Sequence, residues 1–221
     1  NMYFAPESLL DDQGRRIMWA WIFDGPGFKM RTDTGWSGTM SLPRVLSLGA
    51  DGVLRMAPPE EIALLRYNGK KKTNVSVSAD SEVKLDGISG NSLEVSLQLD
   101  PKDAKQCGLK VCCSPNGEEE TLVYYDAAEK KLKVDTTKSS ATGSPKGVEG
   151  GPFELKSGEP LHLRVFIDKS VVEVFANDRQ AVMRRVYPSR DDSIGVKLFS
   201  KGGAAHAATV EAWEMMPSNA H

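Results

Sequence analysis

Residues 93–99 read LEVSLQL, with an apolar side chain at every odd position and a polar side chain at every even one. Because successive side chains of a β-strand point to opposite faces of a sheet, this alternation predicts a strand with one buried face. Residues 160–168, PLHLRVFID, repeat the pattern. These two segments indicate that this part of the chain is built from β-sheet.

Further short segments rich in β-branched and aromatic residues continue the pattern in both directions, separated by turn residues. Strands are expected at residues 17–23, 39–48, 53–56, 109–113, 120–125, 131–134, 171–175, 181–187, 193–199 and 207–215. Such regular spacing is typical of a β-sandwich. Residues 139–151 are rich in Gly and Ser and are predicted to form a mobile loop.

One segment favours a helix. Pro58 and Pro59 precede Glu60 and Glu61, and proline followed by acidic residues is typical of a helix start. The apolar run that follows ends at Leu65. We therefore predict a short connecting helix.

Composition excludes several classes of function. The chain has 221 residues and a formal net charge of −2, which argues against nucleic acid as a partner. Its densest basic run, Lys70 to Lys72, is expected in a solvated turn or at a strand end. No apolar stretch approaches the roughly 20 residues of a membrane helix. The N-terminus lacks a signal-peptide pattern, and a start at Asn1 is what a fragment or a processed product would show.

The cysteines do not indicate a disulfide framework or a metal site. Cys107, Cys112 and Cys113 are odd in number and include an adjacent pair. The three histidines are scattered, whereas zinc ligands usually come in closely spaced pairs. We expect thiols buried in a strand, no bound metal and no cofactor.

Four motifs follow one another along nearly the whole chain. They read YFAPES (3–8) with GRRIMWAWI (14–22), GWSG (35–38) with MSLPR (40–44), LKVDTTKS (132–139), and DKSVVEVFAN (168–177) with RVYP (185–188). Together and in this order, they resemble glycoside hydrolase family 32, which contains invertases, levanases, inulinases and fructan exohydrolases.

The resemblance implies an architecture and a domain division. The family has a five-bladed β-propeller followed by a β-sandwich. Residues 1–48 would then be the end of the propeller catalytic domain, residues 49–68 a linker with a short helix, and residues 69–221 the C-terminal β-sandwich. Four blades and part of the fifth would precede Asn1.

The family's catalytic motifs are absent from this sequence. Retaining glycosidases use two carboxyl groups about 5 Å apart, and the family takes its catalytic carboxylates from Asn-Asp-Pro, Glu-Cys and Arg-Asp-Pro motifs. The only Asp-Pro here is Asp100-Pro101, preceded by leucine, and no cysteine follows a glutamate. We therefore assign no catalytic residue. The adjacent pairs Asp11-Asp12 and Asp191-Asp192 are expected in solvated turns.

The resemblance implies one substrate-binding residue, Trp21. In the family, the second tryptophan of a Trp-(Gly/Ala)-Trp stretch lies at the pocket wall and packs against the sugar, and here that stretch is Trp19-Ala20-Trp21. The alternative for Trp21 is a position in the blade core or at an interface. For Trp19 we favour this alternative. Trp36 and Arg44 are expected at the blade edge and the propeller–sandwich junction.

Residues 171–176 read VVEVFA and carry apolar side chains at both odd and even positions. This pattern indicates a strand buried on both faces, with one face against the propeller. Glu173 is expected to pair with a nearby base, Arg184 or Arg185.

These observations predict the C-terminal part of a β-fructofuranosidase-type hydrolase, inactive alone. It would act on a fructoside or fructan through the complete enzyme, with a complementary chain supplying the missing blades. The alternatives are a carbohydrate-binding module and a structural β-sandwich. Apolar blade residues left without a neighbour would favour self-association.

Overall fold

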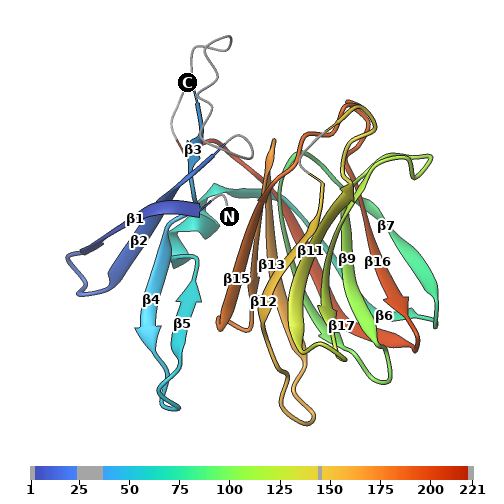
Figure 1. The fold of residues 1–221 in the computed structure, drawn as a ribbon, viewed down its shortest axis with the longest axis horizontal. Helices are drawn as coiled ribbons and strands as arrows, with labels where there is room; N and C mark the ends of the chain where they lie inside the picture. Colours follow the sequence, from blue (N-terminus) through green and yellow to red (C-terminus); the bar gives the residue numbers. More distant parts are fainter. Residues whose placement is uncertain (1–2, 24–36, 144–145, 219–221) are drawn as a thin grey trace.

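The computed structural model describes residues 3–23, 37–143 and 146–218. These ranges form three antiparallel sheets and one 3-10 helix, η1 (Glu60–Leu65), which confirms an all-β protein (Figure 1). The N-terminal sheet has the order β1-β2-β4-β5, with β3 also paired to β2. Its strands are β1 (Tyr3–Leu10), β2 (Arg16–Ile22), β3 (Thr39–Met40), β4 (Arg44–Leu48) and β5 (Leu54–Ala57). No helix in the described ranges is long and apolar enough to cross a membrane.

The other two sheets have six strands each. The first, called the β14 sheet, has the order β15-β14-β13-β8-β17-β6. Its strands are β6 (Arg66–Val77), β8 (Ser92–Asp100), β13 (Leu161–Asp168), β14 (Val171–Ala176), β15 (Gln180–Arg185) and β17 (Ala205–Met215). The second, called the β10 sheet, has the order β12-β11-β10-β9-β16-β7. Its strands are β7 (Ser81–Ser89), β9 (Gln106–Cys113), β10 (Glu120–Asp126), β11 (Lys131–Lys138), β12 (Val148–Pro152) and β16 (Gly195–Lys201).

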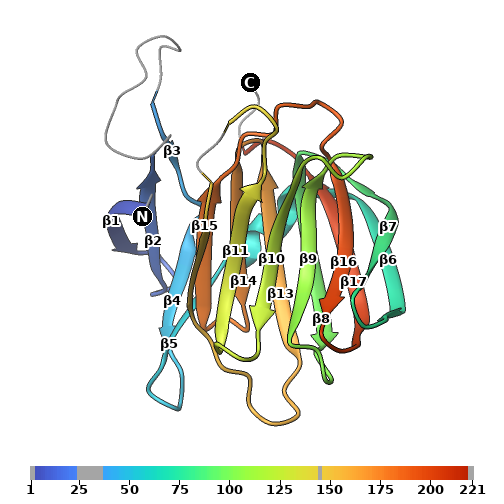
Figure 2. The same cartoon turned by 45° about the vertical axis from the view of Figure 1, so that its right-hand side comes forward.

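The two six-stranded sheets lie face to face, and we call them together the stack (Figure 2). The alternating residues of β8 and β13 fill the space between the sheets, with Val95 directly opposite Val165 and both fully buried. Burying one such side chain stabilises the fold by about 1.5–3 kcal/mol. The alternation of residues 93–99 is thereby confirmed for its apolar positions.

Buried thiols belong to the same core. Cys107, Cys112 and Cys113 all lie in β9 and are free and buried, as expected from the sequence. Burial raises the pKa of each thiol to about 12. A thiol with so high a pKa is a poor nucleophile at neutral pH, so these cysteines act as core residues.

The N-terminal sheet and η1 pack against the β14 sheet through two apolar clusters. Ile22 of β2 meets Val171 and Met183, and Ile62 of η1 meets Phe166 and Phe175. One face of β14 lies in these clusters and the other in the core between the stacked sheets, so all six of its residues are buried, which confirms the prediction of a strand covered on both faces. We call these contacts the junction.

Three local predictions were wrong. Residues 39–48 form two strands rather than one, because Pro43 has no N–H to donate and Ser41 bonds instead to the backbone of Ala20. Residues 148–151, predicted as part of a loop, lie in β12, which pairs with β11. Lys70 to Lys72 lie within β6 rather than in a turn or at a strand end.

The region predicted as the linker, residues 49–68, has its own structure. It contains β5, which pairs with β4, then η1 and the start of β6. The 3-10 helix fits the predicted short connector. The domain limits derived from the sequence remain predictions. Trp36, expected at the blade edge, lies outside the described residues.

Candidate functional site

Trp21 lies on β2 in an aromatic group at one end of the N-terminal sheet. Its neighbours across the strands are Phe4 of β1 and Met40 of β3. The indole meets Phe23 edge to face, with 4.6 Å between ring centroids. A side-chain carbon at Gly38 would lie 1.8 Å from the indole nitrogen, so this close approach requires glycine.

Strand alternation places Trp21 on the face of the N-terminal sheet that is turned away from the stack. Ile22, the next residue, is fully buried in the junction, so Trp21 points the opposite way. Trp19 shares the face of Trp21 because the two are two residues apart. Both indoles are only partly buried. The structure therefore leaves the assigned residue accessible, and its contact with a sugar remains a proposal.

The junction contains one buried ion pair. Arg44 Nη2 lies 2.9 Å from Glu173 Oε2, and the backbone N–H of Leu42 donates to Glu173 Oε1 at 2.6 Å. The Arg44 guanidinium also lies over the rings of Tyr3 and Phe175, at 4.4 and 5.4 Å from their centroids. Arg44 therefore occupies the boundary between the N-terminal sheet and the stack, as the sequence predicted.

The predicted partner of Glu173 was wrong. Arg184 pairs with Glu149 of β12, and Arg185 bonds to the hydroxyl of Tyr187 at 2.9 Å. Arg184 and Arg185 are close to Glu173 in sequence. The N-terminal sheet covers the Glu173 face of β14, however, and this brings in a base 129 residues away.

Burial dominates the electrostatics of this pair. Desolvation raises the pKa of Glu173 above its ordinary value, although Arg44 and the Leu42 N–H favour the charged form. A pair of this kind adds little net stability, because the loss of water offsets most of the attraction. The Arg44–Glu173 pair therefore fixes the position of the N-terminal sheet on the stack, but it contributes little to the stability of the junction.

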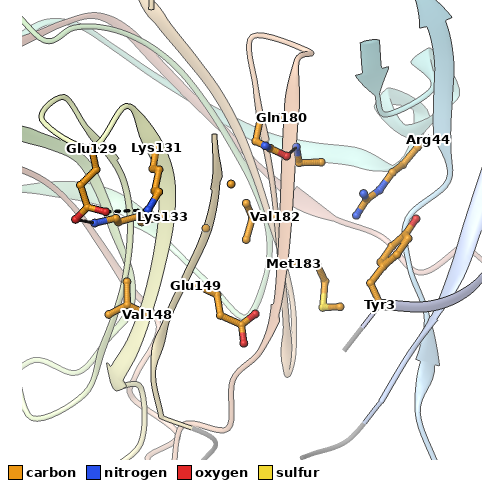
Figure 3. A pocket seen from close by; sticks show the side chains of 13 residues that line it. Tyr3, Arg44, Glu129, Lys131, Lys133, Val148, Glu149, Gln180, Val182 and Met183 are labelled. Atoms are coloured by element: carbon orange, nitrogen blue, oxygen red, sulfur yellow. Dashed lines mark hydrogen bonds and ion pairs between the residues drawn. The ribbon is translucent and has the colours of Figure 1, made fainter. Parts of the chain in front are cut away.

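A polar groove opens beside the junction (Figure 3). It has a volume of about 750 Å³ and is lined by Tyr3 and Arg44 of the N-terminal sheet, Lys131 and Lys133 of β11, Glu149 of β12 and Gln180 of β15. The strands β12 and β15 are the edges of the two stacked sheets, and the groove runs where these edges meet the N-terminal sheet. Nothing in the local sequence pattern indicated it.

Two buried carboxylates were also missed. Glu94 was placed on the polar face of its strand, yet it is fully buried between Arg66 and Arg164, with Nη2 and Nε of these arginines at 2.6 and 2.9 Å from Oε1. Glu119 is equally buried and accepts hydrogen bonds from two separate loops. Pairing of β8 with β13 is what brings Arg164 to Glu94.

The acidic pairs considered from sequence lie in turns. Asp11 accepts from the guanidinium of Arg15 at 2.7 Å, and Asp192 pairs with Arg190 at 2.8 Å. These contacts confirm the expectation of solvated turns. Within the described ranges, no group of three His, Cys, Asp or Glu side chains could hold a metal ion.

The fold and the junction define an all-β protein in which a small sheet is held against a two-sheet stack. Residues 61–214 match the family model described as "Glycosyl hydrolases family 32 C terminal". Residues 1–58 match the model described as "Glycosyl hydrolases family 32 N-terminal domain". The chain therefore belongs to glycosyl hydrolase family 32.

Relatives in this family cover nearly all of the chain. Sucrose-6-phosphate hydrolase of Zymomonas mobilis subsp. mobilis is 29% identical over 223 residues, which is 98% of this chain and 42% of the relative. A levanase of Bacillus sp. (strain L7) is 32% identical over 221 residues, covering 95% of this chain and 24% of the relative. The chain thus spans less than half the length of these relatives.

A solved structure agrees with the fold. Fructan 1-exohydrolase IIa from Cichorium intybus superposes with a TM-score of 0.88 at 21% sequence identity. The match covers 99% of this chain and 49% of that one. At this identity the likeness shows the fold.

Proposed function

We propose that this chain is the C-terminal part of a β-fructofuranosidase-type glycoside hydrolase that cleaves sucrose or fructans. The observation that carries the proposal is the consecutive match of the family's N-terminal and C-terminal models to residues 1–58 and 61–214. The named relatives, a sucrose-6-phosphate hydrolase and a levanase, support substrates that contain fructose.

In this proposal the stack is the C-terminal β-sandwich, and the N-terminal sheet is the end of a five-bladed propeller. The catalytic carboxylates would come from propeller blades that this chain does not contain. This chain would supply the sandwich and one edge of the sugar pocket. The superposition on a fructan exohydrolase supports this division.

Trp21 is proposed as the wall of that pocket. Its indole lies on the face of the N-terminal sheet turned away from the stack, beside the half-exposed ring of Phe4. An aromatic ring suits the apolar face of a furanose. Trp19 shares this face, but we propose that it is covered by a neighbouring blade.

The purified chain is expected to release no fructose from sucrose, inulin or levan, because its sequence lacks all three catalytic motifs. Fructose is measured by chromatography after prolonged incubation. A longer protein that continues upstream of Asn1 through the three motifs is expected to hydrolyse at least one of these substrates. Steady fructose release by the pure chain, or an inactive longer protein with all three motifs, would sink the proposal.

The same assay on the longer protein tests the role of Trp21. Trp21→Ala is expected to lower kcat/KM about tenfold, which corresponds to an aromatic contact of about 1.5 kcal/mol. Trp21→Phe should recover part of the loss, and Trp19→Ala is the matched control. Equal losses in the two alanine variants would argue against a pocket role for Trp21.

The partner of this chain is proposed to be the part of the enzyme that carries the remaining blades. The observation behind this is an accessible edge strand, β1, in a sheet with several exposed apolar side chains. They are Phe4, Leu9, Leu10, Met40, Leu48 and Leu54, each at least 47% exposed. Such a surface is a ready site for docking or self-association.

The isolated chain is therefore expected to self-associate as its concentration rises. Light scattering should show an average mass that increases from 24.1 kDa. The double variant Leu10→Glu/Met40→Glu places charges on the N-terminal sheet and should stay closer to the monomer. Leu64→Glu is the control, since Leu64 is 79% exposed but lies on η1, outside that sheet. A wild-type chain that is monomeric at every concentration would contradict the proposal.

A further inference from the structure

Strand β6 contains a bulge at Asn68 and Gly69. The register of β6 with β17 shifts between Ala212 and Glu214, and neither Asn68 nor Gly69 has a partner residue in this pairing. A bulge leaves an extra residue outside the regular ladder of hydrogen bonds. Within the described ranges β6 is also the last strand of its sheet, so no strand pairs with its other side (Figure 2). The exposed backbone at this point is therefore less restrained than the rest of the strand.

The fold itself favours asparagine followed by glycine here. Asn68 has a φ of 48°, a left-handed conformation that asparagine adopts more readily than most residues. A side-chain carbon at Gly69 would lie 3.0 Å from the indole nitrogen of Trp213, so glycine fits without displacing the indole. The guanidinium of Arg66 lies over the same indole, 4.0 Å from the ring centroid. This dipeptide is also chemically labile, because glycine has no side chain that shields its backbone nitrogen.

A second Asn-Gly pair, Asn116-Gly117, provides an internal comparison. It lies in the turn between β9 and β10, and Asn116 is exposed as Asn68 is. The side-chain oxygen of Asn116 accepts from the hydroxyl of Ser114 at 2.8 Å and from the N–H of Glu118 at 3.2 Å. The N–H of Gly117 donates to the carbonyl of Ser114 at 3.1 Å. These bonds hold both the amide and the backbone nitrogen next to it.

The amide of Asn68 is held at one atom. Its Nδ2 donates to Glu214 Oε1 at 3.1 Å, and its Oδ1 has no hydrogen-bond partner among the described residues. Each hydrogen bond that must break before an amide can react slows the reaction, because it stabilises the starting conformation. Of the two Asn-Gly pairs, the one in the bulge is therefore the less protected.

We propose that Asn68 is a site of spontaneous deamidation, with water as the co-reactant. The backbone nitrogen of Gly69 bonds to Cγ of Asn68 and gives up its proton, while Nδ2 takes up a proton and leaves as ammonia. Water then opens the cyclic succinimide. Cleavage of the new Cγ–N bond gives aspartate, and cleavage of the original peptide bond gives isoaspartate, in which the backbone runs through Cγ. In total, an amide and water become a carboxylic acid and ammonia.

The modification changes the contacts at the end of β17. A carboxylate at this position would replace the amide that now donates to Glu214, so two like charges would meet in place of a hydrogen bond. The next residue, Met215, packs against the apolar cluster that Ile62 of η1 forms at the junction. Deamidation is therefore expected to loosen the pairing of β6 with β17 beside the junction.

The test follows both Asn-Gly pairs in the ageing 221-residue chain by peptide mapping and mass spectrometry. Trypsin releases residues 67–70 and residues 111–130, which carry one pair each. In the folded chain, the first peptide is expected to gain the mass of an amide-to-acid exchange about tenfold faster than the second. In concentrated urea, which removes the hydrogen bonds of both sites, the two rates should converge. Equal or slower conversion at Asn68 in the folded chain, or the same rate difference in urea, would overturn the proposal.

Substitutions separate the site from its consequence. Asn68→Gln should stop the mass gain in residues 67–70, because the longer side chain closes the ring poorly. Asn68→Asp imitates the product and is expected to lower the urea midpoint of unfolding. Asn116→Asp is the matched control, since its carboxylate can still accept from Ser114 and Glu118 and should leave the midpoint near that of the wild type. Equal midpoints in the two aspartate variants would contradict the loosening of β6 and β17.

Discussion

Glu173→Ala is expected to destabilise the chain by about 3–5 kcal/mol. The substitution leaves the guanidinium of Arg44 buried at the junction without its counter-charge, which is the costly way to disrupt a buried ion pair. It also removes the acceptor of the Leu42 N–H. Because the lost contacts join the N-terminal sheet to the stack, that sheet should unfold first. Urea titration followed by tryptophan fluorescence and circular dichroism would show two separated transitions.

The double variant Arg44→Met/Glu173→Leu separates charge from packing. It is expected to lie within about 2 kcal/mol of the wild type, since both buried charges are gone and only the Leu42 N–H lacks an acceptor. Glu154→Ala is the control, because Glu154 forms an exposed pair with Lys130 and should change stability by less than about 1 kcal/mol. A Glu173→Ala chain as stable as that control would show that the junction does not depend on this pair.

Glu119→Gln is expected to be the second large loss, about 2–4 kcal/mol at neutral pH. Glu119 accepts from the N–H of Ala141 at 2.7 Å and from the hydroxyls of Ser189 and Ser193 at 2.5 Å each. Ala141 lies in the loop that follows β11, and the two serines lie in the loop that connects β15 to β16. One carboxylate therefore holds these two loops together. The glutamine amide has one acceptor oxygen, so it can replace only one of the two carboxylate oxygens of Glu119. Its NH₂ group would stand at the other position and face N–H and O–H donors there.

The pH dependence of stability tests the same residue. Burial alone would raise the pKa of Glu119, but the hydrogen bonds from Ser189, Ser193 and the Ala141 backbone lower it to about 2. A lowered pKa in the folded state means that the stabilisation is complete above the ordinary pKa near 4.5 and is lost as the pH falls toward 2. The wild type should therefore lose more stability than Glu119→Gln over this interval.

Glu118→Gln provides the control for both measurements. Glu118 is the neighbouring residue and is exposed, with a 3.2 Å contact to Arg190. Its replacement should shift the unfolding midpoint little and leave the pH profile parallel to that of the wild type. If Glu119→Gln and the wild type had parallel profiles between pH 4.5 and 2, the carboxylate would not be the group that senses pH here.

Much of the fold could be predicted from the sequence, because strand alternation is a local property. Successive side chains of a strand point to opposite faces, so Val95 and Val165 face the core between the stacked sheets while the residues next to them in sequence point the other way. The burial of β14 on both faces is visible in the sequence VVEVFA. The edge strand β12 was missed because Gly and Pro dominate its five residues and weaken the apolar signal. The hydrogen bonds to β11, rather than its amino-acid composition, make β12 a strand.

The candidate site, like the fold, could be predicted only in part. Trp21 is a proposal from a short motif, and alternation alone places it opposite the face of Ile22. Arg44 was expected at the junction, but its partner was not found, since Glu173 lies 129 residues away. The groove was not predictable, because its lining residues come from three sheets and lie far apart in the sequence.

The sequence by itself determined the all-β class, the positions of most strands along the chain, the buried thiols and the family to which the chain belongs. Each of these depends on short-range periodicity or on motifs read along the chain. Tertiary structure decided which base neutralises Glu173, how Glu94 and Glu119 come to be buried, and where the groove opens. The physical reason is that a buried charge is stabilised by whatever group the packing of distant strands brings within a few ångströms, and no local pattern carries that information.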